Sequence, residues 1–127
     1  MEGRAWPETA EALMRSRYSA FALRNVGWLK ESLWPKYQKT LDMAELTEFA
    51  QTRQWIGLEI LQVEKGSVDD KTGMVKFVAK ALENGEVREH REASLFRKKK
   101  GTLVLRGGRG RRAGEGVAEA MIRRCRP

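Results

Sequence analysis

The chain has 127 residues, of which 41% are hydrophobic and 33% charged, and its formal net charge is +8. This length suits one domain with a single core, and the composition is typical of a folded globular protein rather than a disordered chain. No apolar run approaches the ~20 residues that a membrane-spanning helix needs. The only cysteine, Cys125, cannot form an internal disulfide, so we expect a cytoplasmic protein.

The positive charge is concentrated near the C-terminus. Residues 102–127 carry a net charge of +5, whereas residues 1–101 carry +3. The charge of the whole chain therefore overstates the indication of nucleic-acid binding. The run Arg-Lys-Lys-Lys at residues 97–100 could contact phosphates, although a solvated turn is its simplest explanation.

The first half of the chain has the periodicity of helices. Apolar residues recur at three- and four-residue spacing from Thr9, which is suited to cap a helix, to about Leu23. A shorter helical segment, residues 26–34, is stopped by Pro35. Asp42 opens a third helix in a pattern that resembles a capping box.

From Trp55 onward the period changes to two, which indicates strands. Asn84-Gly85 is a strong signal for a β-hairpin. Helices followed by hairpin-linked strands predict an α+β fold with an antiparallel sheet. The predicted strands are residues 55–61, 75–81, 87–96 and 102–105.

Four blocks of sequence occur in an order that points to a family. They are residues 9–23, which include Arg-Ser-Arg-Tyr-Ser-Ala-Phe, residues 55–61, which begin Trp-Ile-Gly-Leu-Glu, and residues 73–79 and 92–96. Together they resemble the bacterial YchJ-like proteins, which carry a SEC-C metal motif. The resemblance implies the cone-shaped fold of nuclear transport factor two, in which helices close over a curved antiparallel sheet and leave a pocket.

The resemblance divides the chain into a leader (residues 1–8), a cone-fold domain (residues 9–101) and an atypical Arg/Gly-rich tail (residues 102–127). Typical relatives begin with a Cys-rich SEC-C motif, but none of the first eight residues is Cys or His. Because Cys125 and His90 are the only Cys and His, we expect no zinc site and no cofactor. The chain is then a shortened relative, or one whose start codon was assigned too late.

The tail departs from the family pattern. Relatives end on a strand similar to Gly-Arg-Trp-Phe-Tyr-Val-Glu-Gly, where residues 101–108 read Gly-Thr-Leu-Val-Leu-Arg-Gly-Gly. Codons can be chosen for residues 101–108 such that a shift of the reading frame by one base makes the same DNA encode Gly-Arg-Trp-Phe-Tyr-Val-Glu. We interpret residues from about 102 onward as a frameshifted tail, and expect those beyond about 106 to be disordered or loosely attached. A genuine Arg/Gly-rich segment is the alternative.

Five residues are candidates for lining a ligand pocket. Arg17 and Tyr18 lie in the run that marks the family, and a guanidinium suits a carboxylate or phosphate; a charged helix surface beside a core tyrosine is the alternative. Glu59 and Glu92 lie on different predicted strands, where they either meet inside the cone or face outward as ordinary strand charges. Trp55 offers either a stacking surface or core packing.

The sequence contains no P-loop, dinucleotide fingerprint or nucleophile elbow, and we assign no catalytic residue. We predict a non-enzymatic pocket or interaction domain with an unknown small molecule or protein as partner, and a homodimer through the open sheet face is compatible with this fold. One alternative is a small hydrolase or isomerase, supported by fold analogy alone. The other is nucleic-acid binding through the basic hairpin and tail. A pocket filled by aromatic and aliphatic side chains would favour a binding domain over an enzyme.

Overall fold

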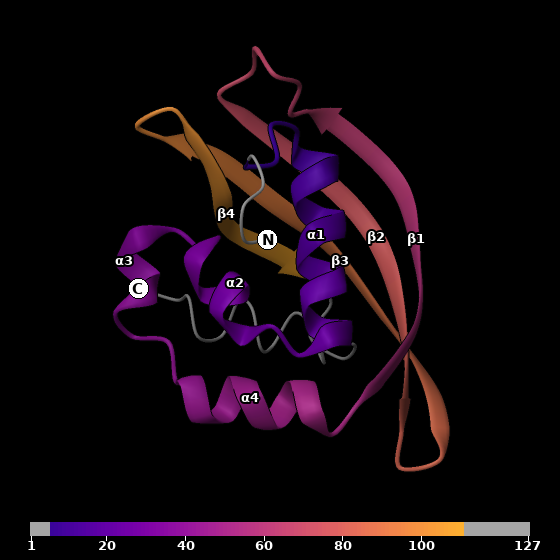
Figure 1. Cartoon of the computed structure of the whole chain (residues 1–127). Coiled ribbons are helices and arrows are strands. Elements are labelled where there is room, and N and C mark those ends of the chain that lie inside the picture. Colours follow the sequence, from indigo (N-terminus) through magenta and orange to yellow (C-terminus); the bar gives the residue numbers. More distant parts are fainter. Residues whose placement is uncertain (1–5, 111–127) are drawn as a thin grey trace.

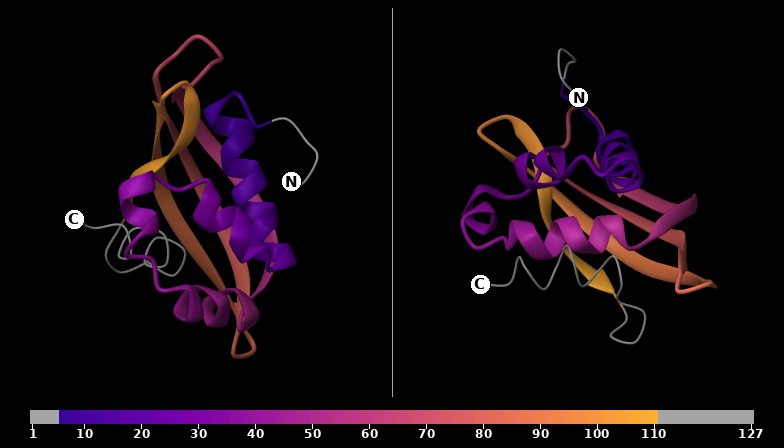
Figure 2. Two further views of the ribbon diagram at one scale, coloured as in Figure 1. Left: turned by 60° about the vertical axis from the view of Figure 1, so that its left-hand side comes forward. Right: turned by 60° about the horizontal axis from the view of Figure 1, so that its bottom comes forward.

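The computed structural model describes residues 6–110 and has the predicted α+β fold. Four helices precede four strands in this part of the chain, and the helices lie over one face of a strongly curved sheet (Figures 1 and 2). None of these helices is long and apolar enough to cross a membrane. The elements are α1 (Ala10–Leu23), α2 (Val26–Glu31), α3 (Pro35–Gln38), α4 (Met43–Gln51), β1 (Gln54–Lys65), β2 (Thr72–Glu83), β3 (Glu86–Lys99) and β4 (Thr102–Gly110).

Two of the predicted helix starts are confirmed by their caps. The Thr9 hydroxyl accepts a hydrogen bond from the Ala12 amide at 3.1 Å, and the Asp42 carboxylate accepts one from the Glu45 amide at 3.0 Å. Each side chain satisfies an amide that has no partner within its own helix.

The helix in the region predicted as residues 26–34 is shorter than predicted. Helix α2 ends at Glu31, and the separate turn α3 begins at Pro35. The chain leaves the helix to pair with β4. The Trp34 amide donates to the Leu105 carbonyl at 2.9 Å, and the Leu105 amide donates to the Ser32 carbonyl at 2.8 Å. Pro35 is suited to the first position of α3, where its nitrogen needs no hydrogen-bond partner.

The sheet is a meander in the order β1-β2-β3-β4, and every neighbouring pair is antiparallel. At the β2–β3 hairpin Asn84 and Gly85 both have positive φ, at 52° and 82°, as the tight turn requires. This hairpin extends past α4 at the lower end of the molecule in Figure 1.

Strand β4 is longer than the predicted run at residues 102–105. Its backbone pairs with β3 as far as Gly110, which lies opposite Glu92. The expectation of a loosely attached chain beyond residue 106 therefore does not describe residues 107–110. The rest of the tail, including Cys125, and the first five residues of the leader lie outside the described residues.

The core lies between the helices and the concave face of the sheet. Alternate residues of β2 point inward and are buried, and they pack against apolar side chains of α1. The buried residues of these two elements include Val75, Phe77, Ala79 and Ala81 on β2, and Leu13, Met14 and Phe21 on α1.

The start of α1 lies directly on the loop between β1 and β2. The Ala10 amide donates to the Gly66 carbonyl at 2.9 Å. Gly66 has a φ of +79°, and a Cβ placed on Gly73 would lie 2.5 Å from the Gly66 Cα. Only glycine fits so close an approach of two backbones, so this pair sets how tightly α1 covers the sheet.

Candidate functional site

Four of the five candidate residues face the interior between the helices and the sheet. Arg17 and Tyr18 lie on α1, Trp55 is the second residue of β1, and Glu92 lies on β3 opposite the buried Phe77. The structure brings Arg17 close to Glu92 and Tyr18 close to Trp55.

Arg17 is only 2% exposed, which is rare for a charged side chain. Its Nη1 donates to the Leu29 carbonyl at 2.9 Å and to the hydroxyl of Ser32. Ser32 in turn donates to the Trp28 carbonyl at 2.6 Å. The guanidinium therefore joins α1 to the end of α2.

Glu92 is 3% exposed, and among the described residues no hydrogen bond reaches either of its carboxyl oxygens. Burial raises the pKa of this carboxyl to about 8, and the opposing effects of the Arg17 charge and the Ser94 side chain offset only part of that rise. Since burial disfavours the charged form, Glu92 is largely protonated at neutral pH.

Tyr18 and Trp55 form an aromatic pair whose ring centroids lie 6.2 Å apart in an edge-on arrangement. Trp55 also contacts the rings of Phe21 and Phe49, at 5.9 and 6.1 Å. Burial raises the pKa of the Tyr18 hydroxyl, while a hydrogen bond with the Gly57 backbone lowers it by less. Trp55 is thus surrounded by aromatic side chains.

Glu59 lies on the other face of the sheet. It pairs with Val78, which in turn pairs with Arg91, and this row alternates with the inward row of Leu58, Ala79 and His90. Glu59 is exposed, so the structure does not bring it together with Glu92.

A second buried polar group lies near the β2–β3 hairpin and was not among the candidates. His90 is 5% exposed, and its Nε2 lies 2.6 Å from the Glu83 carboxylate, which also pairs with Arg53 at 3.2 Å. The Arg53 guanidinium lies 3.9 Å from the centre of the Phe49 ring. The lone histidine gave no sequence signal, because its partners come from β2 and the end of α4.

Surface depressions within residues 6–110 include two that none of the five candidates line. The larger, about 320 Å³, lies across β1, β2 and β3 and includes Met74, Leu95, Arg97 and, from β4, Arg106 in its lining. The smaller, about 270 Å³, lies between the N-terminal segment and the β3–β4 turn, and includes Trp6 and Lys98. Within residues 6–110, no three His, Cys, Asp or Glu side chains are grouped to hold a metal ion.

The sequence matches the family described as YchJ, middle NTF2-like domain, over residues 9–108. Among curated proteins, a UPF0225 protein from Geobacter sulfurreducens is 39% identical over 90 residues, which cover 71% of this chain and 56% of that protein. One from Haemophilus influenzae is 43% identical over 94 residues, covering 72% of this chain and again 56% of the relative. The chain therefore spans about half the length of these relatives.

Two solved structures share the fold. A solution structure of a SEC-C motif containing protein from Rhodopseudomonas palustris has a TM-score of 0.76 at 27% identity, covering 84% of this chain and 82% of the other. A crystal structure of a SEC-C motif containing protein from Psychrobacter arcticus has a TM-score of 0.72 at 27% identity, covering 83% of this chain and 62% of the other. Both agree with helices packed on a curved antiparallel sheet.

Proposed function

The chain belongs to the YchJ family through its NTF2-like middle domain, and from that premise we propose that it is a binding or interaction domain without catalytic activity. The observation that carries this proposal is the closure of its interior. Among the described residues, Glu92 is the one inward carboxyl with a strongly raised pKa. Its side chain is enclosed by the fold, since the residue is only 3% exposed.

The side chains around this carboxyl support a structural role. Phe77, which pairs with Glu92 across the sheet, and Phe96, farther along β3 on the same face, are fully buried. Arg17 on the opposite wall already donates to Leu29 and Ser32. A general acid or base has to come within hydrogen-bond reach of its substrate, which a carboxyl enclosed in this way does not.

The hydrolase or isomerase alternative would need two titratable groups that face a common open pocket. His90 and Glu83 lie within hydrogen-bond distance, but Glu83 is also paired with Arg53, and neither lines the two surface depressions described above. A histidine that is hydrogen-bonded to a glutamate and packed 5.6 Å from the Trp55 ring is typical of a structural contact. A cytoplasmic location, proposed from the single cysteine, fits such a domain.

Carbodiimide labelling with glycine ethyl ester tests whether small molecules reach the interior. The reagent needs a protonated carboxyl, and the raised pKa of Glu92 supplies one near pH 6. We therefore expect that any protection of Glu92 reflects restricted access rather than unsuitable chemistry. Glu59, exposed on the opposite face, is the internal control.

In the native protein, peptide mapping by mass spectrometry should find Glu59 labelled and Glu92 unlabelled, and both should be labelled in urea. Native labelling of Glu92 at a rate near that of Glu59 would show an open interior. That result would overturn the proposal and favour an enzyme that uses this carboxyl.

A further inference from the structure

The larger surface depression lies on the convex side of the sheet, where residues of β1, β2 and β3 line it together with Arg106 of β4, and we call it the β4 groove. Its apolar lining includes Met74 and Leu95 on this face, and its charged lining consists of Glu64, Lys65, Arg97 and Arg106. Its volume of about 320 Å³ is at the lower end of the range of small-molecule sites. The groove therefore suits a compact ligand with an apolar part.

Glycine in β4 keeps this apolar lining uncovered. Gly107 pairs directly with Leu95, so a side chain at residue 107 would lie beside Leu95 on the same face of the sheet. A Cβ placed on Gly107 would meet no atom within 4 Å. The space over Leu95 is thus open because this strand position lacks a side chain.

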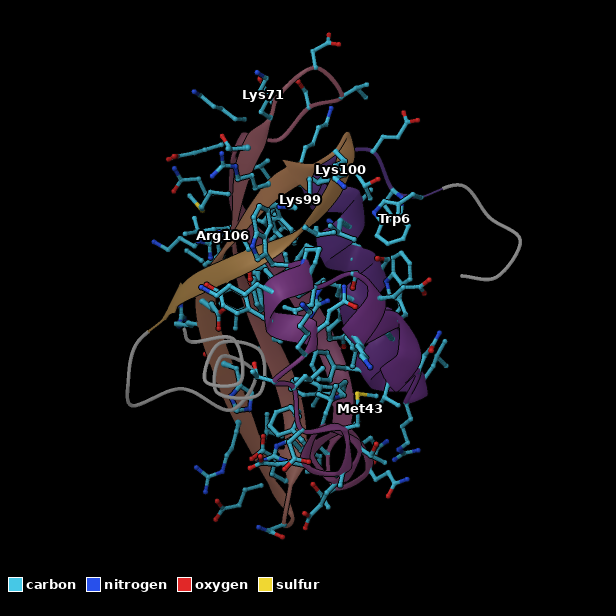
Figure 3. All side chains as sticks on the ribbon, turned by 90° about the vertical axis from the view of Figure 1, so that its left-hand side faces the viewer. Trp6, Met43, Lys71, Lys99, Lys100 and Arg106 are labelled. Atoms are coloured by element: carbon cyan, nitrogen blue, oxygen red, sulfur yellow. The ribbon has the colours of Figure 1, made fainter. Side chains whose placement is uncertain are left out.

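Two cations of the groove lining, Arg97 and Arg106, gather with Lys99 around one aromatic ring. The charged groups of Lys99, Arg106 and Arg97 lie 5.1, 5.0 and 5.9 Å from the centre of the Trp34 ring. The pleat of β3 puts Arg97 and Lys99 on the same face, and the bulge between Leu95 and Phe96 brings Arg106 toward them. Figure 3 labels Lys99 and Arg106 on this side of the molecule.

Within the described part of the chain, no carboxylate pairs with these cations. None of the ion pairs within residues 6–110 involves Arg97, Lys99 or Arg106. Glu64 in the lining instead accepts a hydrogen bond from Gln62 at 2.5 Å. Like charges held close together repel each other, so an anion bound among them relieves that repulsion and gains charge-assisted hydrogen bonds.

We propose that the β4 groove binds a small amphipathic anion, with its carboxylate or phosphate among Arg97, Lys99 and Arg106 and its apolar body over Met74 and Leu95. This inference deepens the proposed function, on which it rests, by naming the class of ligand. The size of the groove favours a small molecule. The cations already placed around Trp34 leave that ring less suited to stack a nucleic-acid base than an open aromatic face would be.

The test measures binding of hexanoate by chemical-shift titration of the ¹⁵N-labelled protein at low salt. Hexanamide keeps the apolar body without the charge, and inorganic phosphate keeps a charge without the body. We expect saturable shifts around Leu95 and the Trp34 indole with hexanoate. The affinity for hexanamide and for phosphate should be lower by about fivefold or more, because each lacks one of the two contributions.

Two variants and one control locate the site. Arg97→Gln removes a cation that forms no ion pair within residues 6–110, and Gly107→Leu adds a side chain beside Leu95 whose Cβ meets no atom within 4 Å; each should weaken hexanoate binding by about fivefold or more. Arg91→Gln is the matched control. It removes an exposed arginine from the same strand and face, outside the groove lining, and should leave binding unchanged.

The proposal is overturned if hexanoate gives no saturable shifts, or if both groove variants bind it as well as the unaltered chain does. It is also overturned if single-stranded oligothymidylate binds with micromolar affinity through the same residues, since the site would then be a nucleic-acid interface. Because the labelling of Glu92 concerns the opposite face of the sheet, either experiment can fail while the other succeeds.

Discussion

Strand β3 carries charged residues on both faces of the sheet, and these residues are buried on the inner face and exposed on the outer face. Glu92 points inward, is 3% exposed and has a pKa raised to about 8 by burial. Arg97 points outward, is exposed and forms no ion pair among the described residues. The inner carboxyl is enclosed by the fold, whereas the outer guanidinium is available to a molecule from solution.

This difference separates structural charge from binding charge. A buried charge costs free energy unless it is paired or neutralised, so the inner face has Arg17 anchored by hydrogen bonds and Glu92 mainly protonated. An exposed charge costs little and contributes little to stability. Substitutions on the inner face should therefore change stability, and those on the outer face should change binding.

The largest expected effect is that of Arg17→Met. This change removes the donor to Leu29 and Ser32 and the positive charge near Glu92, and it should lower the free energy of unfolding by about 3 kcal/mol or more. Urea denaturation measures the change.

Arg15→Met is the matched control on the same helix. Arg15 is 53% exposed and pairs with Glu11, so its loss should cost no more than about 0.5 kcal/mol. Equal losses for the two variants would contradict the distinction between the inner and outer faces.

Gly73→Ala should have the next largest effect. Its Cβ would lie 2.5 Å from the Gly66 Cα and 3.0 Å from the Ala10 Cβ, so the β1–β2 loop and the start of α1 that rests on it have to shift. We expect a loss of about 2 kcal/mol in urea denaturation. Gly57→Ala in β1 is the control, since a Cβ there meets nothing within 4 Å; a Gly73→Ala protein as stable as this control would show that α1 is not held by the glycine contact.

The pH dependence of stability should identify Glu92. Its folded pKa of about 8 lies above the ordinary value of 4.5, so between these values the folded state keeps a proton that the unfolded state has lost. Raising the pH therefore favours unfolding, and the contribution present below about pH 4.5 is lost as the pH approaches about 8.

Between pH 6 and pH 8 this carboxyl should lower the free energy of unfolding by about 2 kcal/mol, because each pKa unit corresponds to about 1.4 kcal/mol. Glu92→Gln resembles the protonated form and should remove that part of the slope. Parallel stability curves for the variant and the unaltered chain would show that Glu92 has an ordinary pKa. Denaturation at several pH values makes the comparison.

The smallest effect is expected for Arg97→Gln. Because Arg97 is exposed and forms no ion pair within residues 6–110, its loss should change the free energy of unfolding by less than about 0.5 kcal/mol. In thermal and urea denaturation, the variant should be as stable as the unaltered chain. A loss as large as that of Arg17→Met would mean that the cations around Trp34 hold the fold together rather than serve binding.

Much of the fold could be predicted because its signals are local. The caps at Thr9 and Asp42, the period of two after Trp55 and the Asn84-Gly85 turn each depend on a few neighbouring residues, and all of them occur in the structure. The α+β class and the antiparallel sheet follow from these elements in order. Strand ends and α3 were missed, because they depend on pairing with distant residues.

The sites depended on contacts that no local pattern contains. Glu59 and Glu92 both lie in strands with an alternating pattern of apolar and polar residues. The β-bulges of β1 and the pairing register decide that Glu92 faces Arg17 while Glu59 faces solvent. Trp34 lies more than sixty positions before Arg97 and Arg106, the cations that surround its ring. These residues meet because β4 pairs with the chain after α2. The sequence by itself determined the helices, the strands and their order, since hydrogen bonding and side-chain periodicity act over a few residues. Only the tertiary structure decided which charges are buried and which remain free, because burial depends on how distant segments pack.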